Sequence, residues 1–346
     1  MCVSDRLVIL AEAYSTDPHY AKTMNGVLRY RREDVVAVLD SERVGETRDG
    51  VPVVGTVADA LEFAPTAALV GVATQGGRFP PAWRELLRDC IRAGLTIENG
   101  LHEMLGDDAE MTALAAEHGV ALHDLRRPPV GLDCPTGANL EVPAQIVLTV
   151  GSDCAIGKMT VSLELDRAAR AREIASQFVP TGQTGIAIAG WGISVDAVVA
   201  DFIAGATERL VVEGAQRGGK LLWVEGQGSL VHPAYSGVTL GLVHGSAPHA
   251  FVLCDQAGAT EIDGYPGATL PPLRELVTLH EMISLQQRKA PVLCVAVNTR
   301  FLSSDDEART AIDAIAAETG LLADDPVRFG ADRLLVAVLD GLPALD

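Results

Sequence analysis

The strongest chemical signal in this sequence is a glycine-containing loop that ends in a lysine. The apolar run at residues 145–150 leads into Gly151, Ser152, Asp153, Cys154, Ala155, Ile156, Gly157, Lys158, Met159 and Thr160. Glycines let a loop curl until its backbone N–H groups converge, and the positive end of a following helix points at the same place. Lysine occurs only at positions 22, 158, 220 and 289. The pattern predicts that residues 151–160 bind the phosphates of a cofactor, with a plain strand–turn–helix as the alternative.

The loop departs from the pattern of nucleotide hydrolases in two places. Gly151 lies one residue before the strict G-x4-G-K-[ST] spacing, and Met159 stands where a hydroxyl would ligate Mg²⁺. Thr160 is an imperfect substitute for that hydroxyl. The longer loop resembles that of dethiobiotin synthetase-like enzymes, which favours phosphate binding over metal-dependent chemistry. We therefore expect no bound metal.

A second glycine-rich segment, Thr181–Gly185, follows another predicted strand. It offers backbone donors, hydroxyl groups and an amide, so Gln183 and Thr184 are predicted to bind the cofactor; the alternative is a simple turn. Because the carboxyl ends of parallel strands meet at one edge of a sheet, we expect this segment to lie near the phosphate-binding loop.

Residues 225–233 carry the candidate catalytic groups. Glu225 ends a predicted strand, as a Walker-B carboxylate does, and His232 follows on the same loop. Either residue is a candidate general base, and His232 alternatively caps a turn before Pro233. Gln227 and Ser229 are predicted to bind the substrate. The absence of a G-x-S-x-G elbow argues against Ser229 as a nucleophile.

Amide and guanidinium groups complete the candidate ligands. Asn298 closes the predicted strand at residues 292–297, where its amide can pair with an adenine edge or serve a turn. Arg78, Arg126 and Arg127 are predicted to bind substrate carboxylates through paired hydrogen bonds. Solvated surface arginines are the commoner alternative for each of these three residues.

The composition excludes several classes of protein. The 346-residue chain is 48% hydrophobic, long enough for two domains, and has a formal net charge of −19, which argues against nucleic acid and anionic membranes as partners. The first residues lack a signal pattern and no apolar run approaches about 18 residues, so we expect a soluble, cytoplasmic protein. We also expect it to be a homo-oligomer that acts on a small molecule. The cysteines lack the spacing of a zinc site or a disulfide framework, and Cys154 is interpreted as a small turn residue.

Short apolar runs alternate with helical patterns along the chain, which predicts βαβ units and parallel sheets. Predicted strands lie at residues 7–10, 35–39, 68–72, 95–97, 145–150, 176–179, 221–225, 250–254, 292–297 and 334–338. Proline and glycine recur between Arg126 and Pro143, as in an interdomain connection. We predict an α/β protein with an N-terminal domain at residues 1–126, a linker at 127–144 and a doubly wound C-terminal domain at 145–346.

The quoted segments also resemble a known family when taken together. Residues 151–160, 181–185 and 225–233, with Thr239–Gly245, resemble the DgcN-type family of D-glutamate N-acetyltransferases, formerly a domain of unknown function. The resemblance implies a Rossmann-like N-terminal domain and a P-loop NTPase-like C-terminal domain. It also implies acetyl transfer from acetyl-CoA to the amine of an acidic D-amino acid, D-glutamate. It does not identify a catalytic base.

Acetyl-CoA as co-substrate gives Met159 a physical explanation. Coenzyme A carries phosphates and an adenine but undergoes no phosphoryl transfer, so its loop tolerates the loss of the Mg²⁺ hydroxyl while keeping Lys158. The thioester would then lie a pantetheine arm away, with Glu225 or His232 as the base. Two rivals stay open: an ATP- and Mg²⁺-dependent kinase or ligase, and a non-enzymatic regulator that binds a nucleotide or CoA.

Overall fold

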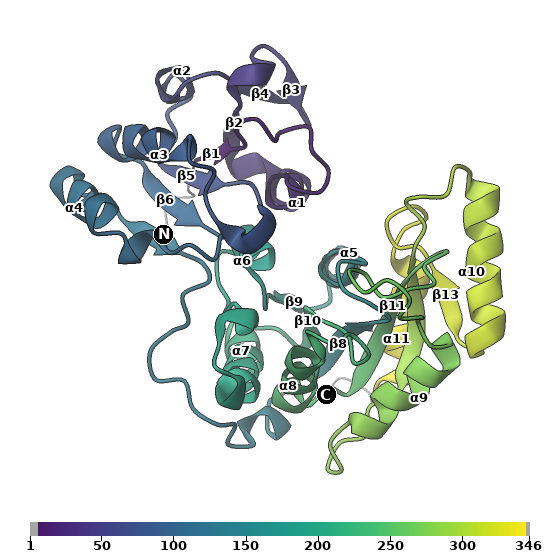
Figure 1. Cartoon of the computed structure of the whole chain (residues 1–346). Coiled ribbons are helices and arrows are strands. Elements are labelled where there is room, and N and C mark those ends of the chain that lie inside the picture. The colour runs from purple at the N-terminus through teal and green to yellow at the C-terminus, as the bar shows by residue number, and fades with distance from the viewer. Residues whose placement is uncertain (1–5, 344–346) are drawn as a thin grey trace. The chain divides into compact units, whose positions relative to one another are not determined.

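The chain forms two compact units, as the computed structural model of residues 6–343 shows (Figure 1). The first unit comprises the chain up to Arg127 together with Gln183–Ser194, and the second comprises Pro128–Gly182 and the chain from Val195 onward. The sequence-based division assigned residues 183–194 to the C-terminal domain, whereas their contacts group them with the first unit.

The first unit is built on a seven-stranded sheet in the order β3-β4-β2-β1-β5-β6-β7. Its strands are β1 (Leu7–Leu10), β2 (Val35–Leu39), β3 (Thr47–Arg48), β4 (Val51–Val54), β5 (Ala67–Val70), β6 (Thr96–Asn99) and β7 (Leu122–Asp124). All neighbouring pairs are parallel except β3 with β4. Every residue of β1 and β5 is buried, as expected for parallel strands covered on both faces.

Helices cover both faces of this sheet. They are α1 (Lys22–Tyr30), α2 (Val57–Leu61), α3 (Trp83–Arg92), α4 (Ala109–His118) and α6 (Gln183–Ala189). The segment at residues 181–185, predicted as a glycine-rich loop, is already helical from Gln183. Helix α6 packs on α1, where the hydroxyls of Thr23 and Thr184 are 2.9 Å apart and Arg31 donates to the carbonyl of Ala187 at 3.0 Å.

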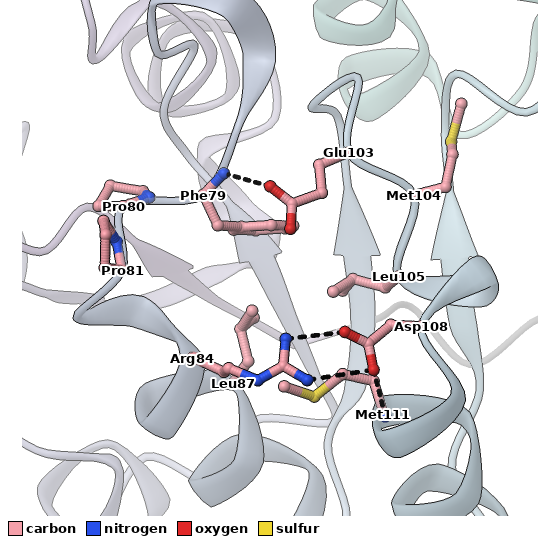
Figure 2. A pocket seen from close by; sticks show the side chains of 10 residues that line it. All are labelled: Phe79, Pro80, Pro81, Arg84, Leu87, Glu103, Met104, Leu105, Asp108 and Met111. Carbon is pink, nitrogen blue, oxygen red and sulfur yellow. Dashed lines mark hydrogen bonds and ion pairs between the residues drawn. The ribbon is translucent and has the colours of Figure 1, made fainter.

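A surface hollow of the first unit lies beside the start of α3 (Figure 2). Its wall includes the carboxylate of Glu103, which accepts the N–H of Phe79 at 3.0 Å, and the guanidinium of Arg84, which pairs with Asp108 at 2.7 Å. The charged groups that line this hollow are satisfied by one another and by backbone, so we assign it no ligand.

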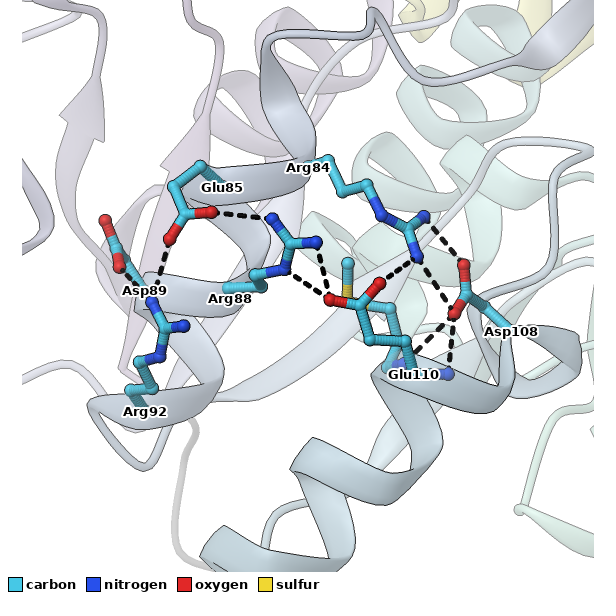
Figure 3. Close-up of polar contacts among 8 residues, drawn as sticks. Arg84, Glu85, Arg88, Asp89, Arg92, Asp108 and Glu110 are labelled. Atoms are coloured by element: carbon cyan, nitrogen blue, oxygen red, sulfur yellow. Dashed lines mark hydrogen bonds and ion pairs between the residues drawn. The ribbon is translucent and has the colours of Figure 1, made fainter.

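Ion pairs join α3 to α4 on the exposed face of the first unit (Figure 3). Arg84 pairs with Glu110 at 2.6 Å as well as with Asp108, and Arg88 pairs with Glu110 at 2.5 Å. Asp108 is also the N-cap of α4, because its carboxylate accepts the N–H groups of Glu110 and Met111 at 2.9 and 3.1 Å. Exposed ion pairs contribute little, so the cap is the more valuable contact.

The second unit holds a six-stranded, fully parallel sheet in the order β13-β12-β11-β8-β10-β9. Its strands are β8 (Gln145–Gly151), β9 (Ser176–Val179), β10 (Leu221–Val224), β11 (Ala250–Gln256), β12 (Val292–Asn298) and β13 (Leu322–Asp324). Strand β8 lies between β11 and β10, with Gly151 opposite Cys254 and Leu148 opposite Val224. The carboxyl ends of these three strands therefore meet around the loop that follows β8.

The helices of the second unit are α5 (Lys158–Ala171), α7 (Ile203–Gln216), α8 (Ser236–Ser246), α9 (Leu273–Ile283), α10 (Asp305–Thr319) and α11 (Asp332–Gly341). The strand predicted at residues 334–338 is wrong, because these residues belong to α11. Leu334, Leu335 and Val338 are buried at helical spacing against the sheet core. The predicted class, α/β with two domains built on parallel sheets, is confirmed. Within residues 6–343, no helix combines the length and apolar character needed to cross a bilayer.

We expect Asp108→Ala to lower the free energy of unfolding of the first unit by about 1 kcal/mol, because α4 loses its N-cap. Asp108→Asn keeps a capping oxygen and should recover most of that loss. Urea denaturation and hydrogen exchange of α4 measure both variants. Equal destabilisation by Ala and Asn would show that the ion pair with Arg84, rather than the cap, is the stabilising contact.

Candidate functional site

Glycine stands at two crowded or left-handed positions of the segment that starts at the end of β8. A Cβ added to Gly151 would lie 2.8 Å from Cδ1 of Ile156 and 3.2 Å from Nζ of Lys158. Gly157 has φ +117°, a conformation that side chains disfavour, immediately before the first residue of α5. The loop is thus wound closely around its own lysine, as the sequence predicts.

Lys158 is buried, with 6% of its surface exposed, and its Nζ donates to the carbonyl of Asp153 at 2.6 Å. The side chain therefore folds back over the loop, and its charge lies where the loop curls. Met159 and Thr160 follow in the first turn of α5 and are half-buried. An ammonium group at the start of a helix is suited to an anion.

Ser152 ties the loop to two neighbouring strands. Its hydroxyl donates to the carboxylate of Asp255 at 2.6 Å, and its carbonyl accepts the hydroxyl of Ser229 at 2.9 Å. Ser229 was predicted to bind substrate, and in this structure it is fully buried against the loop. Asn298, at the end of β12, donates from Nδ2 to the carbonyl of Ile156 at 3.0 Å. Its amide thus braces the loop at residues 151–160, while its predicted contact with adenine stays a prediction.

Asp255, near the end of β11, is a site residue that the sequence analysis missed. It is 9% exposed, and burial raises its pKa to about 6, although the hydrogen bond from Ser152 opposes that rise. The predicted strand stopped at Cys254, one residue before it. The sequence did contain a signal for Asp255, namely a carboxylate directly after an apolar run. The same pattern identified Glu225 as a candidate.

Glu225 points toward the end of β9. Its Oε2 accepts the N–H groups of Thr181 and Gly182 at 2.9 and 3.1 Å, and its carbonyl accepts the Thr181 hydroxyl at 2.7 Å. Gln227 donates from Nε2 to the carbonyl and the hydroxyl of Thr181. Asp255 and Glu225 thus stand at the ends of the two strands that flank β8. Asp255 accepts the Ser152 hydroxyl, and Glu225 accepts backbone N–H groups that follow β9.

His232 lies against the tip of the loop and is 3% exposed. Its ring stacks on Tyr235 with centroids 4.6 Å apart and meets Tyr265 edge-on at 5.2 Å. Its Nδ1 accepts the N–H of Ala234 at 3.2 Å, a local contact of the kind that the turn-capping alternative predicts.

The other predicted ligands belong to the first unit. Gln183 and Thr184 begin α6. Arg126 is buried and donates from Nε to the carbonyl of Gly100 at 2.8 Å. Arg127 pairs with Asp107 at 2.8 Å and with Asp124 at 3.2 Å, and Arg78 is exposed. The guanidinium groups of Arg126 and Arg127 thus have protein partners, and the binding roles of all five residues stay predictions.

Comparisons with known proteins agree with the two-unit architecture. The family model described as a domain of unknown function, DUF1611_C, P-loop domain, matches residues 133–335. The model described as DUF1611_N, Rossmann-like domain, matches residues 39–128. A crystal structure of a DUF1611 family protein from Anabaena variabilis is 40% identical, with a TM-score of 0.89 over 97% of this chain and 99% of that one.

Two curated relatives are similar over most of the chain. A D-glutamate N-acetyltransferase from Tritonibacter scottomollicae is 37% identical over 82% of this chain and 84% of its own length. A D-glutamate N-acetyltransferase from a Pseudoalteromonas species is 33% identical over 81% of this chain and 83% of its own length. The chain belongs to the DUF1611 family, which confirms the resemblance and the predicted Rossmann-like and P-loop domains.

The raised pKa of Asp255 leads to a prediction about stability. Between about pH 4 and about pH 6 the unfolded chain loses this proton while the folded chain keeps it, so the buried carboxylate lowers stability as pH rises through that window. Asp255→Asn keeps an acceptor for Ser152 and should stabilise the second unit at pH 7.5 by up to about 3 kcal/mol. Chemical denaturation of both proteins at pH 4 and pH 7.5 measures this. A difference between the proteins that is independent of pH would contradict it.

Proposed function

We propose that this protein transfers the acetyl group of acetyl-CoA to the amine of D-glutamate. The observation that carries the proposal is the similarity to two D-glutamate N-acetyltransferases, over 82% and 81% of the chain. The loop supports it independently, because it combines a buried lysine and the start of α5 with Met159 at the position of the Mg²⁺ hydroxyl. An enzyme that binds a phosphate-bearing cofactor without transferring phosphate keeps the anion-binding groups and tolerates the loss of the Mg²⁺ hydroxyl.

In this proposal the loop at residues 151–160 holds the phosphates of coenzyme A. Backbone N–H groups and the ammonium of Lys158 would supply the positive potential. Asn298 and Ser152 hold the loop from β12 and β11 and keep its shape when no ligand is bound. His232 lies at the loop tip, so we place it with the cofactor rather than with the reacting amine.

Glu225 is the better candidate for the general base. The backbone N–H groups of Thr181 and Gly182 bind its Oε2 and orient the carboxylate at the carboxyl ends of β10 and β9. In the reaction the substrate ammonium gives a proton to the base, and the amine nitrogen then attacks the thioester carbonyl. The C–S bond breaks, and the nitrogen gives its second proton to the departing thiolate, so the products are the amide and the free thiol of coenzyme A.

The substrate ligands and the setting complete the proposal. Arg78 keeps an exposed guanidinium, and Gln227 lies beside Glu225 on the β10 loop, so both remain candidates for the carboxylates of the amino acid. A homo-oligomer in the cytoplasm, where acetyl-CoA is available, is part of the same proposal.

Acetyl transfer is tested with purified protein, acetyl-CoA, and D-glutamate or L-glutamate. We expect thiol release that requires D-glutamate, with N-acetylated product identified by mass spectrometry. A parallel reaction with ATP and Mg²⁺ tests the kinase or ligase rival. ADP formation that requires Mg²⁺ and is abolished by Lys158→Ala, without thiol release, would overturn the proposal. Acetyl-CoA binding without turnover of any amino acid would favour a regulator.

Lys158→Ala and Glu225→Gln should impair the enzyme in different ways, one in cofactor binding and the other in turnover. Loss of a charge-assisted phosphate contact should weaken acetyl-CoA binding by about ten- to hundredfold, whereas loss of a base should lower kcat by about 10²- to 10⁴-fold with nearly unchanged affinity. Calorimetry and steady-state kinetics measure the two effects. Lys220→Ala, at an exposed position, and Glu213→Gln, at a half-buried position of the same unit, are matched controls. Normal turnover of Glu225→Gln at saturating acetyl-CoA would show that the base lies elsewhere.

A further inference from the structure

Three side chains with different metal-binding chemistry meet at the tip of the phosphate-binding loop. One ligand atom each from Asp153, Cys154 and His232 lies within 4.8 Å of the other two. We propose that these three residues bind one divalent transition-metal ion, of which zinc fits best. This reverses the expectation drawn from sequence spacing, because the histidine comes from the loop after β10 and the other two residues come from the loop after β8.

The separation of the ligand atoms is close to that of a zinc site. Zinc bonds of 2.0–2.3 Å in tetrahedral geometry place ligand atoms roughly 3.3–3.8 Å apart. The present limit of 4.8 Å therefore requires shifts of about an ångström when the ion binds. Carboxylate, thiolate and imidazole together select zinc over Mg²⁺ or Ca²⁺, which prefer oxygen ligands.

Asp153 is already held in place by backbone. Its Oδ1 accepts the N–H of Cys154 and its Oδ2 accepts the N–H of Asp263, each at 2.7 Å. The residue is 4% exposed. Contacts of this kind orient a ligating carboxylate, since each oxygen retains a second lone pair for a metal.

His232 is held by its neighbours as well. Tyr235 and Tyr265 fix the plane of the ring, and Ala234 donates to Nδ1 at 3.2 Å. Metal binding exchanges this single hydrogen bond for a coordinate bond. That exchange is favourable, because a neutral hydrogen bond contributes little net stability and a metal bond contributes much more.

The charges at this edge of the sheet indicate what the ion does. Among residues 6–343, the buried side chains at the ends of β8, β10 and β11 and in the loop include three carboxylates, Asp153, Asp255 and Glu225, beside Lys158. These carboxylates oppose the binding of a phosphate. A divalent ion bound by three protein ligands offsets them and leaves a fourth position for an anionic oxygen. This role rests on the proposed function, whereas the binding of the ion does not.

Cobalt(II) is the probe for this site, because its bond to a thiolate gives an absorption band that zinc lacks. Metal-free protein should bind one equivalent of Co²⁺ with a thiolate-to-cobalt band as the Cys154 thiol releases its proton to solvent, and Zn²⁺ should then displace the Co²⁺. Cys154→Ala should abolish the band. Asp153→Asn and His232→Ala should weaken Co²⁺ binding at least tenfold. Cys134→Ala, at an exposed cysteine of the same unit, should leave the band unchanged.

The readout needs no acetyl transfer, so its failure is distinct from failure of the proposed function. Circular dichroism and Cys154→Ser, a near-isosteric variant, separate loss of a ligand from loss of folding. Absence of a saturable band in the folded wild-type protein would overturn the proposal, as would a band that survives Cys154→Ala. An acetyl group found on Cys154 by intact mass after exposure of metal-free protein to acetyl-CoA would also overturn it, because the thiol would then be a nucleophile.

Discussion

The close approach of two backbones at the end of β8 is the constraint on which the site depends. A Cβ at Gly226 would lie 1.7 Å from the carbonyl oxygen of Thr149, so only glycine lets the chain cross there after β10. The N–H of Gly226 then donates to the Thr149 hydroxyl at 2.9 Å, and that hydroxyl lies 3.0 Å from the hydroxyl of Ser162 in α5. One threonine thus fixes the strand, the helix and the β10 loop against one another. The direction of Glu225 follows from this crossing.

The same edge of the sheet has opposing electrostatic tendencies. The winding of the loop, the start of α5 and Lys158 attract anions, while Asp153 and Asp255 are buried carboxylates that repel them. Burial of a carboxylate lowers the free energy of unfolding, and proteins keep such destabilising groups mainly at functional sites. Charge balance therefore becomes complete only when the site holds its ligands.

Local patterns in the sequence were sufficient for some parts of the structure and insufficient for others. The strand at Gln145–Gly151 and the helix from Lys158 follow from adjacent residues, so they could be predicted. The apolar run at residues 334–338 fits a strand and a helix equally, and its tertiary packing decides for the helix. Asp255 acquires its role from strand register, which places Cys254 beside Gly151. The proximity of Cys154 to His232 likewise depends on which strands are neighbours, and the amino-acid composition does not predict it.

Helix α6 has a consequence for how the chain folds during synthesis. The first unit is discontinuous, because the chain leaves it at Arg127 and contributes Gln183–Ser194 only after two strands of the second unit have been made. Ala187 belongs to the same core as β1 and α1. The N-terminal core therefore stays incomplete until residue 194 has left the ribosome. A gene fragment that ends at the sequence boundary near residue 127 would encode a sheet with one face only partly covered.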